Sequence, residues 1–221
     1  MELKAVVLDM DGTITKFNID YVEARRVALD LLAKMNLCTP DMNDQFSIYS
    51  MLKRVRVGLD NATFITLRER LYHLLEGVEM KAARDVMIYP GVLDTLNDLQ
   101  ERSLKLGLVT NNGRAGTNMT LTRLGLSRFF HAVVTRDDCD EMKPDAGPIR
   151  EVLRELAVEV ENTILVGDGV MDIEAARAAG MSSAAVATGP FAGERLIKAE
   201  PDFLLSSVND LPRLVEMLDG D

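Results

Sequence analysis

The chain has 221 residues, 47% of them hydrophobic, and is long enough to bury a sizeable core in one or two globular domains. It carries 35 acidic and 25 basic residues, a formal net charge of −10. This acidity disfavours nucleic acid as a partner, because binding a phosphate backbone requires a basic surface. No apolar run has the length of a membrane span, and the first residues do not resemble a signal peptide. With only two cysteines, Cys38 and Cys139, we expect reduced thiols in a cytoplasmic protein without a membrane partner.

Short, nearly continuous apolar runs recur along the chain and are separated by stretches with helical spacing. The runs predict strands at residues 3–8, 104–109, 132–134 and 163–166, with 184–187 as a further candidate. Such runs are typical of strands buried on both faces of a parallel sheet. The helical stretches lie at 92–99, 149–156 and 173–179. This alternation predicts an α/β fold with a doubly wound, Rossmann-like parallel sheet.

The alternation stops after the first predicted strand, and residues 15–87 show only helical periodicity. The alternating pattern resumes near Pro90-Gly91, since proline disfavours helix at the residue before it and can begin the next helix. We therefore expect two domains. The α/β core comprises residues 1–14 and 88–221, and a helical domain is inserted at 15–87.

Polar side chains directly follow several of the predicted strands. In open parallel sheets, ligands bind outside the carboxyl ends of the strands, so these side chains are candidates for function. In chain order they are Asp9 and Asp11, then Thr110, Asn111 and Asn112, then Lys143, then Asp168 and Asp172. We expect carboxylates, a hydroxyl and a cation to meet at one edge of the sheet.

This set of groups suits phosphoryl transfer. A carboxylate that attacks phosphorus forms an aspartyl-phosphate and divides a difficult hydrolysis into two easier steps. A second carboxylate two residues away can protonate the leaving alkoxide and later deprotonate the attacking water. Magnesium held by carboxylates offsets the repulsion between the anions, and lysine and hydroxyl donors complete the cradle. Gly12 allows the tight turn that presents both acids to one substrate.

The four groups resemble, in order, the four motifs of the haloacid dehalogenase superfamily of phosphatases, and the resemblance covers nearly the whole chain. The matching segments are Asp9-Met10-Asp11-Gly12-Thr13, Val109-Thr110-Asn111-Asn112, Lys143-Pro144-Asp145, and Gly167-Asp168 with Asp172. Within the superfamily the chain is similar to phosphoglycolate phosphatases. The helical insertion resembles the family's small helical cap, of the C1 type.

The resemblance implies a role for each motif residue. Asp9 is the implied nucleophile, and Asp11 is the implied general acid and base. The implied phosphate ligands are Thr110, Asn111 and Lys143. The implied magnesium ligands are Asp9, the carbonyl of Asp11 and Asp168, supported by Asp172, Gly12 and Thr13.

Asp11 distinguishes between branches of the superfamily. Dehalogenases lack this second aspartate and transport ATPases carry threonine in its place, so Asp11 favours phosphatase or phosphomutase activity. One departure from the family pattern is mild: Gly169 stands where serine or threonine often follows the fourth-motif aspartate. Within the insertion, Arg54 and Arg56 suit a solvated helix face. We leave them, and Tyr21 near the start of the insertion, outside the predicted site.

We predict a magnesium-dependent phosphatase that hydrolyses a small phosphate monoester through an aspartyl-phosphate intermediate. The core motifs do not separate this activity from that of a phosphomutase, which returns the phosphoryl group to a sugar. A catalytically idle protein that binds phosphorylated ligands on the same fold is the alternative from another class. The predicted partner is a small phosphorylated metabolite. Its identity rests with the cap, and the sequence leaves the oligomeric state open.

Overall fold

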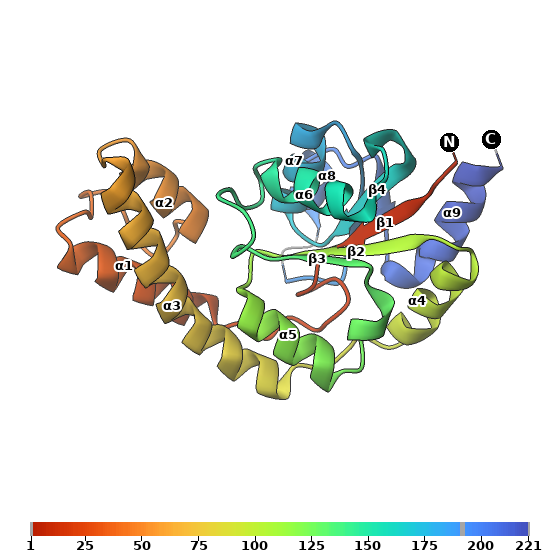
Figure 1. The fold of residues 1–221 in the computed structure, drawn as a ribbon, viewed down its shortest axis with the longest axis horizontal. Coiled ribbons are helices and arrows are strands. Elements are labelled where there is room, and N and C mark those ends of the chain that lie inside the picture. Colours follow the sequence, from red (N-terminus) through yellow and green to blue (C-terminus); the bar gives the residue numbers. More distant parts are fainter. Residues whose placement is uncertain (1, 191–192, 221) are drawn as a thin grey trace.

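The computed structural model describes residues 2–190 and 193–220 and contains a parallel sheet with helices on both faces (Figure 1). Six strands of the described residues pair in the order β3-β2-β1-β4-β5-β6, and every pairing is parallel. The strands are β1 (Ala5–Leu8), β2 (Lys105–Val109), β3 (Ala132–Val134), β4 (Thr163–Gly167), β5 (Ser182–Val186) and β6 (Phe203–Leu205). The predicted α/β class and parallel sheet are therefore confirmed.

Helices cover both faces of the sheet because its central strands are apolar on both sides. Val6 and Leu8 of β1 pack into one core cluster, while Ala5 and Val7 pack into another on the opposite face. One face carries α4 (Val92–Glu101), α5 (Arg114–Arg123) and α9 (Leu211–Asp219), and the other carries α6 (Gly147–Leu156) and α7 (Val170–Ala179). The short helix α8 (Glu194–Lys198) packs against β5 and α7, and 3₁₀ turns lie at Ser127–Phe129, Val160–Asn162 and Val208–Asp210.

The strand order reverses next to β1. The chain builds β1, β2 and β3 outward in one direction and then returns to place β4 on the other side of β1, where Leu8 lies between Leu108 and Val166. Connections on the two sides of this point turn to opposite faces, which opens a crevice at the carboxyl ends of the strands. The predicted site residues follow β1, β2, β3 and β4, so the fold brings them to this crevice.

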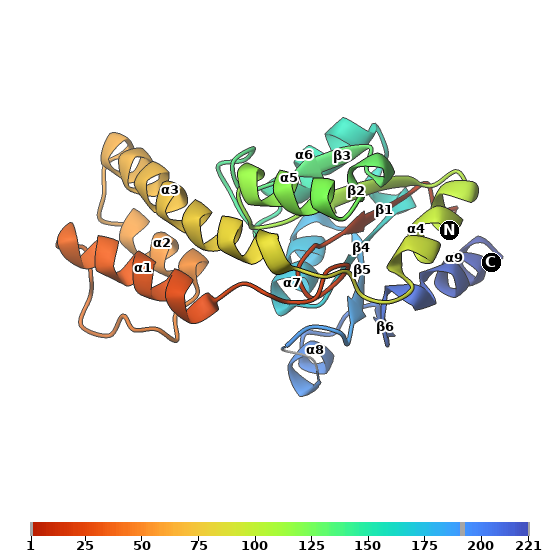
Figure 2. The ribbon, with the colours of Figure 1, turned by 90° about the horizontal axis from the view of Figure 1, so that it is seen from below.

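Three helices between β1 and α4 form a second group beside the sheet. They are α1 (Tyr21–Lys34), α2 (Ile48–Arg56) and α3 (Asn61–Asp85), and they surround an apolar cluster of their own. Asp20, Ser47 and Asp60 cap the three helices, each accepting a hydrogen bond from a backbone N–H of the first turn. Figure 2 shows α3 running from this group to the core, where it packs against α5. The domain boundaries at residues 15 and 88 stay a prediction.

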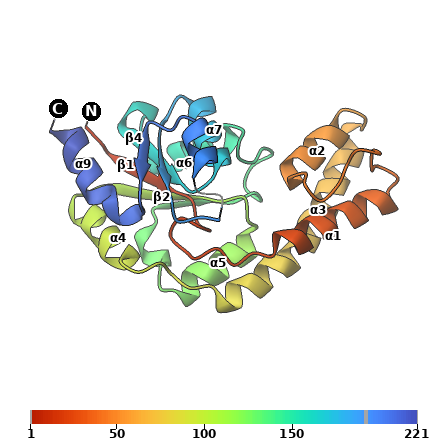
Figure 3. The same cartoon turned by 180° about the vertical axis from the view of Figure 1, so that it is seen from behind.

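The ends of the described chain lie side by side, on the side of the sheet away from α1 and α2 (Figure 3). The backbone N–H of Leu3 donates to a carboxylate oxygen of Asp219 at 3.0 Å, which fastens the start of the chain to α9. None of the helices in the described residues combines the length and apolar character that crossing a membrane requires.

Candidate active site

Five predicted site residues converge at the crevice and are buried there. Asp9 follows β1, Thr110 follows β2, Lys143 lies in the loop after β3, and Asp168 and Asp172 follow β4. Charged groups are rarely buried unless they are paired, so the four charged side chains among them require partners. The sequence predicted this convergence from the order of strands and polar residues, and the structure brings the five together.

The ammonium of Lys143 is the centre of the site. Its Nζ donates to Asp9 Oδ1 at 2.6 Å, to Asp172 Oδ1 at 2.5 Å and to the carbonyl of Val109 at 2.9 Å. Burial alone would lower the pKa of Lys143, but the charges of Asp172 and Asp9 and their hydrogen bonds raise it above its ordinary value. Lys143 is therefore a fixed positive charge next to the predicted nucleophile.

Asp9, Asp168 and Asp172 form a cluster whose ligand oxygens lie within 4.8 Å of one another. Burial raises the pKa of Asp9 to about 6, because the attraction of the Lys143 charge only partly offsets the effect of burial. Burial and the charge of Asp9 raise the pKa of Asp168 to about 8. When all are ionised, three carboxylates and the one ammonium of Lys143 sum to a net charge of −2. Buried, mutually repelling carboxylate oxygens with this charge fit a divalent metal ion.

The turn after β1 holds the cluster together. Gly12 has a φ of +87°, and a Cβ at this position would overlap the carboxylate of Asp168. Only glycine allows the chain to pass this close to the acid. The hydroxyl of Thr13 lies 3.3 Å from both Asp9 Oδ2 and Asp168 Oδ1, so it bridges the two acids. The supporting roles of Gly12 and Thr13 at a metal site stay a prediction.

Asp11 is held by neutral donors rather than by a cation. Asn112 Nδ2 donates to Asp11 Oδ2 at 2.5 Å, and the hydroxyl of Thr15 lies 3.4 Å from Asp11 Oδ1. Burial and the charge of Asp9 outweigh these hydrogen bonds and raise the pKa of Asp11 to about 7. A carboxyl with this pKa exchanges its proton near neutral pH, as a general acid and base must.

Asn111 positions the loop that carries Lys143. Its Nδ2 donates to the carbonyl of Lys143 at 2.9 Å, and its Oδ1 accepts from the backbone N–H of Lys143 at the same distance. Both ends of its side-chain amide are therefore bonded to the backbone of one residue. The phosphate-binding roles of Asn111 and Thr110 stay a prediction. Asp172 is similarly engaged, because its Oδ2 accepts from Gly169 N at 3.0 Å while Oδ1 bonds Lys143.

A cavity of about 350 Å³ joins the acids to the helical insertion. The insertion contributes to its lining Ile19, Tyr21, Ala24, Arg25, Ser47, Ile48, Tyr49, Leu75, Val78 and Glu79. Burial and the charges of Asp168 and Asp9 raise the pKa of Tyr21, which lies within the field of the acids. Arg54 pairs with Asp41 at 2.6 Å and is not among the lining residues.

Sequence reasoning left several functional candidates out of the site. Asn112 was named among the polar residues that follow the strands but was given no role, although it bonds Asp11. Tyr21 was left outside the predicted site, although it lines the cavity. Arg136 also lines the cavity, and with Thr135 it directly follows β3. Searching for polar residues after every strand, not only those with a familiar motif, would have found it.

Comparison with known proteins identifies the family of the chain. A family model for haloacid dehalogenase-like hydrolases matches residues 6–186. The chain is 32% identical to the pyrophosphatase PpaX of Anoxybacillus flavithermus over 96% of both chains. It is 30% identical to a phosphoglycolate phosphatase of Nitrosospira multiformis over 98% of this chain and 97% of that protein. A phosphonoacetaldehyde hydrolase-like protein from Oleispira antarctica shares the fold, with a TM-score of 0.73 at 19% identity, covering 100% of this chain and 94% of that one. The chain therefore belongs to the haloacid dehalogenase-like hydrolase family, as its four motifs indicated.

Proposed function

We propose that the protein is a magnesium-dependent phosphatase that hydrolyses a small phosphate monoester through an aspartyl-phosphate on Asp9. One observation carries the proposal: Asp9 is buried 2.6 Å from the Lys143 ammonium, two residues before an acid whose pKa is about 7. The relatives named phosphoglycolate phosphatase and pyrophosphatase PpaX support the same class of chemistry.

Each site residue has its own role in the proposed reaction. Lys143 neutralises the approaching phosphoryl group and holds Asp9 in place, while Thr110 presents a hydroxyl to the phosphoryl oxygens. Asp9 attacks phosphorus as Asp11, in its protonated form, gives its proton to the leaving alkoxide. Asp11 then takes a proton from the water that hydrolyses the aspartyl-phosphate. Magnesium held by Asp9, Asp168 and the Asp11 carbonyl would supply positive charge against the repulsion between phosphate and carboxylates.

The helical insertion acts in this proposal as a cap over the site. Side chains of α1, α2 and α3 line the same cavity as the acids, so the insertion can exclude water and select the substrate. Closure over the acids is consistent with the position of Tyr21 in their field. We keep residues 15–87 as the extent of this cap.

The proposed ligand is a small phosphorylated metabolite, and the proposed location is the cytoplasm. A cavity of about 350 Å³ admits a small molecule, and the net charge of −10 disfavours nucleic acid and anionic membrane surfaces.

The test is phosphate release from a panel of monoesters with purified protein. We expect turnover with magnesium, loss of turnover in EDTA, and loss in Asp9→Asn, whose amide cannot form the acyl phosphate. Equal rates in the wild type and Asp9→Asn would refute the proposal. Isomerised hexose phosphate in place of free phosphate would instead identify a phosphomutase, and tight binding without turnover would identify a binding protein.

A further inference from the structure

The wall of the cavity that the insertion contributes is largely apolar. Ile48 at the start of α2 and Leu75 and Val78 on α3 line it, and Met142, just before Lys143, continues the apolar surface from the core. Leu75 and Met142 are buried, and the other two are half-buried. The acids therefore lie at one part of a cavity whose wall on the insertion side includes a group of apolar side chains.

Polar side chains in this wall are engaged with the protein itself. The hydroxyl of Tyr49 donates to Asp145 Oδ1 at 2.9 Å, so its phenol is held by the core. The hydroxyl of Ser47 caps α2 by accepting from Ser50 N at 3.1 Å. These two hydroxyls are therefore already hydrogen-bonded to the protein. The neighbouring apolar side chains remain to contact a bound molecule.

Arg25 is the one cation that the insertion contributes to the lining, as far as the structure describes the chain. Its Nη1 donates to the carbonyl of Asp44 at 3.1 Å, and its guanidinium stacks 5.7 Å from the centre of the Tyr21 ring. A second anionic group on a substrate would have to compete with the Asp44 carbonyl for this arginine. The core adds Lys143, Arg136, which pairs with Glu79, and Arg195 of α8 to the lining. A second anionic group would also enter a cavity that already holds the carboxylates of Asp9, Asp168 and Glu79.

We infer that the organic part of the substrate is apolar and about the size of a six-membered ring, and that Ile48, Leu75 and Val78 bind it. The inference rests on the proposed phosphatase function and narrows its substrate class. Each apolar carbon that leaves water against this wall strengthens binding, and a compact substrate such as phosphoglycolate or pyrophosphate lacks the apolar carbons for this gain. The cavity has room for a ring beside the phosphate, since ligand sites begin at about 300 Å³.

The first experiment compares three monoesters of primary alcohols by kcat/KM: 2-phenylethyl phosphate, ethyl phosphate and phosphoglycolate. We expect 2-phenylethyl phosphate to exceed both others by at least about tenfold, as hydrophobic pockets discriminate by this factor for even one methylene. If phosphoglycolate were preferred and Arg25→Gln removed that preference, a distal anion site would replace the apolar one and the inference would be wrong.

A substitution at Val78 tests whether this side chain contacts the apolar part of the substrate. Val78→Thr keeps the shape of the side chain and adds a hydroxyl, so we expect the preference for 2-phenylethyl over ethyl phosphate to fall about threefold to tenfold. Val57→Thr is the matched control, because Val57 is 90% exposed at the end of α2 and is not a lining residue. An equal preference in the two variants would overturn the assignment of Val78.

Binding separates failure of this inference from failure of the proposed function. The non-hydrolysable 2-phenylethylphosphonate and ethylphosphonate can be titrated into the magnesium-loaded protein. Tighter binding of the phenyl compound would support the apolar subsite even if no ester were hydrolysed, in which case only the phosphatase proposal fails. Equal binding together with turnover of all three esters would overturn the subsite and leave the phosphatase proposal standing.

Discussion

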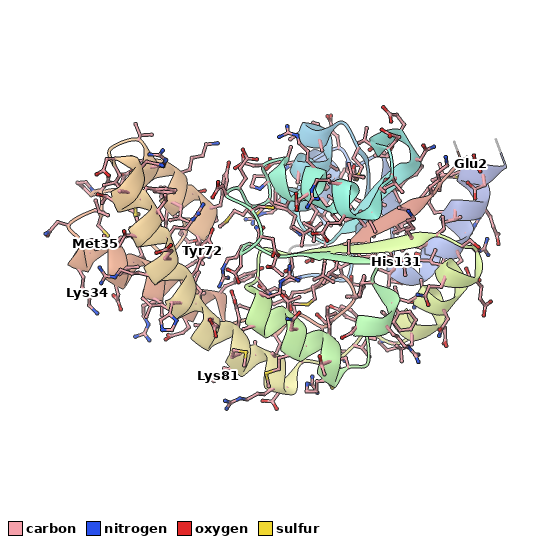
Figure 4. The ribbon with its side chains drawn as sticks, in the orientation of Figure 1. Glu2, Lys34, Met35, Tyr72, Lys81 and His131 are labelled. Atoms are coloured by element: carbon pink, nitrogen blue, oxygen red, sulfur yellow. The ribbon has the colours of Figure 1, made fainter. Side chains whose placement is uncertain are left out.

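Glu79 of α3 and Arg136 of the loop after β3 form a buried ion pair that joins the helical insertion to the core. Both nitrogens at the end of the guanidinium donate to the two carboxylate oxygens. Glu79 also accepts from Gly113 N at 3.0 Å. Arg136 donates to the carbonyl of Tyr72 at 3.2 Å and lies over its ring. Figure 4 shows Tyr72 on the side of α3 that faces the core, whereas Lys81 points away.

The pair connects the position of α3 to the catalytic loops. Arg136 Nη1 lies 3.3 Å from the carbonyl of Asn111, whose side chain holds the backbone of Lys143. Burial raises the pKa of Glu79, and the charge and hydrogen bonds of Arg136 together with the hydrogen bond from Gly113 N oppose this shift. A displacement of α3 would thus reach Lys143 through only two intermediate residues.

Replacing one partner of this pair should lower the free energy of unfolding, and replacing both should lower it by less than the two single losses added together. Glu79→Gln leaves an uncompensated buried guanidinium, and we expect a loss of about 3 kcal/mol in the free energy of unfolding. The double variant Glu79→Leu with Arg136→Met should lose less than the sum of its single variants. Urea unfolding of the wild type, Glu79→Gln, Glu79→Leu, Arg136→Met and the double variant measures these losses. Glu76→Gln, an exposed glutamate one turn earlier, is the control, and a Glu79→Gln loss equal to that of Glu76→Gln would contradict the prediction.

Lys143 should be needed for catalysis far more than for folding. Lys143→Met removes the charge that faces Asp9 and Asp172, and we expect kcat to fall about a hundredfold to a thousandfold, as for other buried donors to a reacting group. Lys105→Met is the control, because Lys105 bonds the carbonyl of Leu156 at the start of β2, the end of the strand opposite the site. Similar losses of kcat in both variants would show that Lys143 acts only through stability.

The strands that were predicted from the sequence are those whose burial on both faces requires a continuous apolar run. The runs at residues 104–109 and 163–166 are apolar because helices cover both of their faces. β6 was not predicted, since it is a three-residue edge strand whose Leu204 is 54% exposed. Short, half-covered strands of this kind carry no continuous apolar run.

Helix α5 was not predicted, for a different reason. Its buried face consists of Gly116, Thr117 and Thr120 with a single leucine, so apolar periodicity is absent. Small residues are needed there because α3 packs closely, and a Cβ at Gly116 would lie 3.0 Å from the Cβ of Glu79. The Glu79–Arg136 pair spans 57 residues of sequence and likewise depends on this packing. The acids were predictable because each directly follows its own strand, whereas contacts between the insertion and the core depend on the tertiary structure.

Metal affinity should rise with pH between 6 and 8. In the metal-free protein the pKa of Asp168 is about 8 and that of Asp9 is about 6, so lowering the pH protonates Asp168 first. A protonated carboxyl must release its proton before it binds the cation, so we expect magnesium to bind up to about tenfold more weakly per pH unit in this range. Calorimetric titrations in two buffers of different ionisation enthalpy would detect the released proton. A dissociation constant that does not change between pH 6 and 8 would contradict the raised pKa of Asp168.

Gly12 should be irreplaceable because of Asp168 and not because of its backbone angle alone. Gly12→Ala places a methyl group on the Asp168 carboxylate, and we expect a loss of about 1–3 kcal/mol in stability together with weaker magnesium binding. Gly125→Ala separates the two causes, since Gly125 also has a positive φ, +68°, but a Cβ there would have open space around it. Because both variants strain the backbone similarly, the difference in their magnesium affinities measures the displacement of Asp168. Equal affinities would mean that the turn after β1 tolerates a side chain and that Asp168 is not held by close contact with Gly12.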